Sequence, residues 1–153
     1  MRVCKLAAHS LGLQVYGTFQ KTPFPLDYDK LDAAAKAKLP VGNYNYVAGS
    51  AGSEATARAN RAAFDDYQIV PSMLRDANKR DLSVTLFGEK HVAPVLLAPV
   101  GVQSIMHPDG ELATARAAQE LQLGMILSTA ATRSLEKVAE ANGNGKRWYQ
   151  LYW

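Results

Sequence analysis

The chain has a single cysteine, Cys4, and no long hydrophobic run. One thiol cannot form an internal disulfide, so a reducing compartment is expected and the cytoplasm is the default location. A membrane-spanning helix needs about 20 consecutive apolar residues, and none of that length is present, so no membrane partner is expected. The three histidines, His9, His91 and His107, lack the spacing of metal ligands, which argues against a zinc site.

Charge of one sign is not concentrated anywhere in the chain. The 17 basic residues are scattered among 14 acidic ones, with a net charge of +3. Without a basic block or interleaved aromatic residues, this distribution indicates a solvated mixed-charge surface and no nucleic-acid partner. A chain of 153 residues can form one domain with its own core. Residues 1–27 are interpreted as a poorly ordered leader, although Arg2 and Lys5 leave organellar or peroxisomal targeting open.

The residues after the leader are predicted to form helices and then a β-hairpin. The helices are expected at residues 28–39, 44–48 and about 54–64. Pro40 ends the first helix, Gly49 ends the second, and Ser53 is placed to cap the third beside Glu54. Short strands are expected at residues 68–71 and 81–87. Alternation in the second strand, followed by a turn at residues 87–90, predicts a half-exposed antiparallel pair.

The rest of the chain alternates between apolar strands and amphipathic helices. Strands are expected at residues 93–100, 125–129 and 147–153, with helices at residues 108–121 and 135–141, the second capped by Ser134. The first of these strands is continuously apolar, which is typical of a parallel strand buried on both faces. The 31 residues from Pro94 to Met125 match one βαβ unit. The fold class is therefore α/β. Because a (β/α)₈ barrel needs about 250 residues, three strands are an incomplete barrel or a small doubly wound sheet.

Polar or small residues follow each of the three parallel strands. They are Pro99-Val100-Gly101, Ser128-Thr129 and Gln150-Leu151-Tyr152. Ligands of parallel α/β proteins bind at the carboxyl ends of the strands, so these residues form a candidate site for a planar, hydrogen-bonding ligand. Ordinary strand-end polarity is the alternative. The loop at residues 49–53 resembles a phosphate cradle, but no buried strand precedes it and no lysine follows it, so a helix cap is preferred.

Several segments together resemble the FMN-dependent α-hydroxy-acid oxidases and dehydrogenases, a family that includes glycolate oxidase and lactate 2-monooxygenase. The shared segments, in the same order and spacing, are residues 39–40, 44–46, 49–54, 60, 63–64, 71, 73–76, 81–83, 98–101, 107–111, 127–129 and 150–152. The resemblance implies that residues 28–153 are the N-terminal part of an FMN hydroxy-acid dehydrogenase domain. The implied fold is an incomplete TIM (β/α)₈ barrel, with N-terminal helices and a hairpin before the first three parallel strands.

The resemblance also assigns roles to the strand-end residues. Tyr46 and Tyr152 are implied to bind the substrate. The cofactor-binding residues implied for FMN are Pro99, Val100, Gly101, Ser128 and Gln150. The implied partners are a small 2-hydroxy acid and oxygen or another electron acceptor, and the full-length protein is expected to be a homo-oligomer.

The catalytic base, a histidine in this family, is implied to lie beyond Trp153, so no catalytic residue is assigned and the chain alone is expected to be inactive. Gly101 and Ala130 tilt the resemblance towards lactate monooxygenase and a lactate-like L-2-hydroxy acid. The product would be a 2-oxo acid or its decarboxylated derivative. A non-catalytic remnant or interaction module that retains part of the barrel is the alternative. A different flavin barrel or a small doubly wound α/β binding protein is a weaker alternative.

Overall fold

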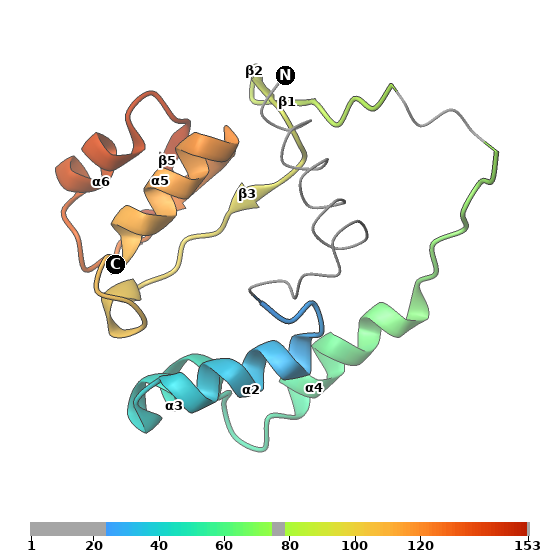
Figure 1. Ribbon diagram of the computed structural model, residues 1–153, viewed down its shortest axis with the longest axis vertical. Helices are drawn as coiled ribbons and strands as arrows, with labels where there is room; N and C mark the ends of the chain where they lie inside the picture. Colours follow the sequence, from blue (N-terminus) through green and yellow to red (C-terminus); the bar gives the residue numbers. More distant parts are fainter. Residues whose placement is uncertain (1–23, 75–78, 153) are drawn as a thin grey trace.

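The computed structural model describes residues 24–74 and 79–152. Most of the predicted leader, part of the 73–76 motif, and Trp153 lie outside the described residues. Among the described elements, a helical group occupies one end of the molecule, and a small parallel sheet with two helices occupies the other (Figure 1). No helix of the described ranges is long and apolar enough to cross a membrane.

The helical group contains α2, α3 and α4. Their bounds are Tyr28–Lys38, Val41–Ala48 and Ala55–Ala62, and the 3-10 helix η2, Ala63–Asp66, follows the last. The predicted helices are confirmed, but α3 begins three residues early because Pro40 can occupy the N-cap without losing a helix bond. The prediction that Ser53 caps α4 is wrong. Glu54 holds that position with a left-handed φ of 59°, and its Oε1 accepts the Ser50 N–H at 3.2 Å.

A two-stranded antiparallel hairpin follows the helical group. It pairs β1, Val84–Leu86, with β2, Glu89–His91. Phe87 and Gly88 connect the strands, and both have positive φ, as a tight two-residue hairpin turn requires. The predicted strand at residues 68–71 is wrong. These residues form no strand and are exposed, because an extended segment needs a partner strand to become part of a sheet.

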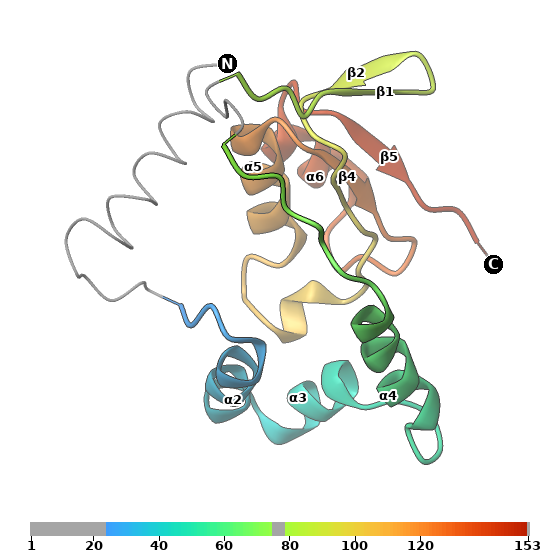
Figure 2. The same ribbon diagram turned by 90° about the vertical axis from the view of Figure 1, so that its right-hand side faces the viewer.

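The second half forms the predicted β-α-β-α-β unit. The parallel sheet has the order β3-β4-β5, with the bounds Leu96–Leu97, Gly124–Leu127 and Arg147–Tyr149. The crossover helices are α5, Glu111–Leu121, and α6, Leu135–Asn142, and the 3-10 helix η3, Gln103–Ile105, precedes α5. Both crossover helices lie on one face of the sheet (Figure 2). The α/β fold is therefore confirmed for this part of the chain.

Several predicted boundaries in this unit are wrong. β4 ends at Leu127 instead of residue 129, and β5 ends at Tyr149, since residues 150–152 form no strand. The strand expected at residues 93–100 is only partly buried and has just two ladder residues, because it is an edge strand and Pro94 and Pro99 have no N–H to donate. Helix α5 begins at Glu111 instead of Pro108, since Gly110 enters it with φ 49° and ψ −129°, outside the helical region. The cap predicted for α6 is confirmed, with Ser134 Oγ accepting the Lys137 N–H at 3.4 Å.

The core lies between the sheet and the two crossover helices. Its buried residues are Ala115, Ala118, Met125, Leu127 and Val138. The alanines of α5 allow close approach to β4, whose side chains at alternate positions point towards the helices. Asn142 is also buried, and its Nδ2 donates to the Ala115 carbonyl at 3.1 Å. This packing fixes the two helices, and with them the loops at the carboxyl ends of the strands.

Candidate functional site

The polar residues that follow β4 and β5 meet at the carboxyl end of the sheet. Ser128 is buried, with 5% of its surface exposed, and its Oγ donates to Gln150 Oε1 at 3.2 Å. The Gln150 N–H donates to the Leu127 carbonyl at 2.9 Å, which extends the parallel ladder by one residue beyond β5. The hydroxyl and the amide that sequence analysis assigned to one ligand therefore lie side by side.

The residues that follow β3 lie against the same corner. A Cβ added to Gly101 would sit 3.2 Å from Ala130 Cβ and 3.6 Å from Ser128 Oγ. Val102 N–H donates to the Ala130 carbonyl at 3.0 Å, and Ala130 N–H donates to Ser128 Oγ at 3.1 Å. A side chain at residue 101 would therefore be crowded by the loop that follows β4. The structure brings together the predicted residues Gly101, Ser128 and Gln150.

Pro99, Val100 and Tyr152, the other predicted residues of the strand ends, are less buried than Ser128. Pro99 is half-buried, Val100 is exposed, and Tyr152 has 53% of its surface exposed. No hydrogen bond joins Tyr152 to another described residue. Pro99 and Val100 follow β3 and Tyr152 follows β5, so all three lie beyond the carboxyl ends of parallel strands.

Tyr46 lies on α3 and is 69% exposed, without a hydrogen bond to the strand-end residues in the described part of the chain. Its helix is nevertheless attached to the same end of the sheet, because Asn43 Nδ2 donates to the Ile105 carbonyl of η3 at 2.5 Å (Figure 2). Residues three apart share a helix face, so Tyr46 lies on the side of α3 that carries Asn43. The structure places Tyr46 near this end of the sheet but does not bring it into contact with Tyr152.

Glu111 also contributes to this corner, and the sequence analysis did not identify it. Its carboxylate is fully buried at the first residue of α5. Burial raises the pKa of Glu111, but hydrogen bonds from the N–H and hydroxyl of Thr132 and from the Gln103 N–H outweigh burial, so the pKa is lowered overall. In the sequence the only signal was an acidic residue in a first helical turn, and that usually marks an exposed partner of the helix dipole.

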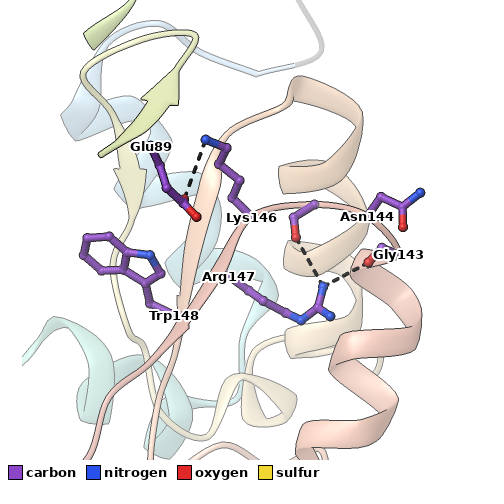
Figure 3. Close-up of a pocket in the computed structure, with 7 residues that line it drawn as sticks. Glu89, Gly143, Asn144, Lys146, Arg147 and Trp148 are labelled. Carbon is purple, nitrogen blue, oxygen red and sulfur yellow. Dashed lines mark hydrogen bonds and ion pairs between the residues drawn. The ribbon is translucent and has the colours of Figure 1, made fainter. Parts of the chain in front are cut away.

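A pocket lies at the opposite end of the sheet, around the start of β5 (Figure 3). The Arg147 guanidinium donates to the carbonyls of Gly143 and Gly145 at 2.9 and 3.2 Å, where it satisfies groups that follow α6. Lys146 pairs with Glu89 of the hairpin at 3.6 Å. Arg147 and Lys146 therefore bind neighbouring groups of the chain and connect β5 to α6 and to the hairpin. The candidate site remains at the carboxyl end of the sheet.

Part of the strand-end corner has the chemistry to contact the isoalloxazine ring of FMN. Val100 is exposed after β3, where a flat ring could contact it. The Oε1 of Gln150 accepts the hydrogen bond from Ser128. The Nε2 of Gln150 has no hydrogen bond to the described residues and can donate to a ring carbonyl. The described ranges contain no cluster of three or more acidic, histidine or cysteine side chains that could hold a metal ion.

Comparison with known proteins identifies the family of the chain. The FMN-dependent dehydrogenase family matches residues 35–153. L-lactate oxidase of Lysinibacillus sphaericus is 44% identical over 133 residues, which are 87% of this chain and 34% of that protein. Human 2-hydroxyacid oxidase 1 is 43% identical over 118 residues, 77% of this chain and 32% of that protein.

A crystal structure of mandelate oxidase with 3,3-difluoro-2-hydroxy-3-phenylpropionic acid has a TM-score of 0.73 and 38% identity, covering 80% of this chain and 36% of that one. The chain thus spans about a third of the length of these relatives. The family match over residues 35–153 and the identity to these relatives show that this chain belongs to the family of FMN-dependent dehydrogenases, for which FMN is the cofactor.

Proposed function

We propose that this chain supplies the first flavin-binding strands and both substrate-binding tyrosines of an enzyme that oxidises a small L-2-hydroxy acid on a TIM (β/α)₈ barrel. The observation that carries the proposal is the hydrogen-bonded pair of Ser128 and Gln150 beside Gly101 at the carboxyl ends of adjacent parallel strands. Family membership supports the cofactor, because the matched family is FMN-dependent.

The chemistry that FMN supplies when bound is acceptance of two electrons from the substrate, which oxygen or another acceptor later removes. In the proposal, the backbone at Pro99, Val100 and Gly101 packs against the ring, while Ser128 and Gln150 hydrogen-bond its polar edge. Tyr46 and Tyr152 donate phenol O–H groups to the substrate carboxylate or hydroxyl. A neutral phenol is suited to this task because it donates without needing to titrate near pH 7.

The substrate class is proposed from the resemblance at two small residues. These are Gly101 and Ala130, which lie against each other at the strand ends. A lactate-like acid is the proposed substrate, with a 2-oxo acid or its decarboxylated derivative as product. The named relatives support 2-hydroxy acids as the substrate class, since they include L-lactate oxidase and 2-hydroxyacid oxidase 1.

The 153-residue chain is proposed to bind FMN without turning over a 2-hydroxy acid. The resemblance assigns no catalytic base to the residues of this chain, and a homo-oligomer is proposed for the full-length enzyme. The single cysteine supports a cytoplasmic location. Turnover of lactate or glycolate by the purified chain would contradict the proposed inactivity.

The test is FMN retention by the purified chain. Flavin absorbance should survive gel filtration with the protein, and titration should quench flavin fluorescence. Ser128→Ala should weaken the affinity about fivefold, because one hydrogen bond contributes about 1 kcal/mol. Thr85→Ala, on the exposed hairpin far from the strand ends, is the matched control and should change nothing. Loss of all flavin from the unaltered chain, or equal effects of the two substitutions, would refute the proposed site.

An interaction module is the second candidate, favoured by exposed apolar side chains. Ile69, Val70 and Leu151 are all exposed, and an apolar groove of about 140 Å³ lies between α6 and β5. Exposed apolar surface favours association. Gel filtration distinguishes the two candidates. A compact monomer free of FMN after incubation with the cofactor would favour the self-sufficient module, whereas a flavin-loaded species would favour the enzyme.

A further inference from the structure

Glu111 is a fully buried carboxylate whose oxygens bind two separate loops. Its Oε1 accepts the Thr132 N–H at 2.9 Å and the Gln103 N–H at 3.2 Å, and its Oε2 accepts the Thr132 hydroxyl at 2.7 Å. Burying a carboxylate is unfavourable unless its oxygens are hydrogen-bonded. Here three donors satisfy it, so the charge is retained and the two loops are held by the same group.

The first of these loops carries the residues assigned to the flavin face. Gln103 follows β3, its Nε2 donates to the Val100 carbonyl at 3.2 Å, and its Oε1 accepts the Thr114 hydroxyl at 2.7 Å. The Gln103 side chain is therefore fixed at both ends, and its backbone N–H is fixed by Glu111. If the Glu111 side chain moved, Gln103 would move with it, and so would the backbone of Val100.

The second loop carries the hydrogen-bonding residues after β4. Thr132 follows Ala130, which bonds Ser128 Oγ through its N–H and Val102 through its carbonyl. The Val102 to Ala130 bond, at 3.0 Å, directly joins the two loops near the flavin face. Glu111 of α5 joins the same two loops a second time. Two attachments fix the orientation of one loop relative to the other, whereas a single attachment would let the loops rotate about it.

We propose that Glu111 is a positioning residue of the flavin half-site, an inference that rests on the proposed function. The carboxylate sets the separation between the loop of Pro99, Val100 and Gly101 and the loop of Ser128 and Ala130. It does so from within the fold, through Gln103 and Thr132, without itself touching the ring. Its loss leaves each loop attached to its own strand but with the ring-binding surface no longer preformed.

The test compares three substitutions in the 153-residue chain. Glu111→Ala removes all three bonds, and FMN affinity is expected to fall at least tenfold, since each bond contributes about fivefold to an equilibrium constant. Glu111→Gln can keep the bonds, because the Thr132 hydroxyl can turn to accept from the amide, and affinity should stay within about threefold. Asn142→Ala also removes a buried hydrogen bond, at the end of α6 away from the strand ends, and is the matched control for stability.

The measurements are flavin fluorescence titration at a temperature where all variants are folded, and hydrogen exchange without FMN. Exchange should accelerate in both residues 99–106 and 128–133 of the Glu111→Ala chain, and in neither segment of Asn142→Ala. Equal FMN affinities of the alanine variants, or faster exchange in only one loop, would overturn the proposal. If the unaltered chain binds no FMN, the proposed function fails while hydrogen exchange alone still decides the role of Glu111.

Discussion

Replacing Gly110 with alanine should be among the costliest single changes in the parallel sheet unit. Gly110 has φ 49° and ψ −129°, a region that only glycine occupies readily. An added Cβ would also lie 3.1 Å from the backbone nitrogen of Ser104 and 3.4 Å from its Cα. The dihedral strain costs about 1–3 kcal/mol, and crowding against backbone adds about 1–3 kcal/mol. We therefore expect Gly110→Ala to lower the free energy of unfolding by about 3 kcal/mol.

Gly143 provides the matched control for this reasoning. It has nearly the same conformation, φ 52° and ψ −120°, but an added Cβ would meet nothing within 4 Å. Gly143→Ala should therefore carry the dihedral cost alone, about 1–2 kcal/mol. Urea unfolding followed by far-ultraviolet circular dichroism measures both variants. If Gly110→Ala were no more destabilising than Gly143→Ala, the contact with Ser104 would be irrelevant, and if neither differed from the unaltered chain, the strain argument would be wrong.

Three further outcomes follow from individual contacts. Folding lowers the pKa of Glu111, so the stability that its carboxylate contributes is complete above the unfolded-state pKa of about 4.3 and is lost as pH falls through the folded-state pKa. Glu111→Gln should therefore reduce the loss of stability at acid pH, as monitored by circular dichroism. Glu89→Gln should cost less than about 1 kcal/mol in urea unfolding, since its 3.6 Å pair with Lys146 is partly exposed. Asn43→Leu, which removes the bond to the Ile105 carbonyl, should speed hydrogen exchange in α3 without altering FMN affinity; unchanged exchange would refute the attachment.

The parts of the fold that sequence predicted are those set by local signals. Ser134 caps α6 because its side chain needs only the N–H three residues ahead. Residues 68–71 have the composition of a strand, yet a strand forms only when another segment pairs with it, and that information is not local. Pro94 and Pro99 were visible in the sequence, but their effect depends on β3 being an edge strand.

The site divides in the same way. Gly101, Ser128 and Gln150 could be predicted because the βαβ pattern alone places the carboxyl ends of successive strands together. Glu111 could not, because its burial depends on Thr132, which lies 21 residues further along the chain. Within a single sequence, an acidic residue at the start of α5 has the same signature whether it faces water or joins two loops.

The two sides of the proposed active site differ in how they are supported. Ser128 is fixed by β4, by the core beneath it and by the loops that Glu111 joins. Tyr46 lies on α3, which has no buried residue and reaches the strand ends through the Asn43 side chain. Helices with little buried surface open at a lower free energy than core strands. The cofactor side should therefore be preformed, while the substrate side can move as α3 shifts, and binding of a 2-hydroxy acid by Tyr46 would then favour the position in which α3 lies against η3.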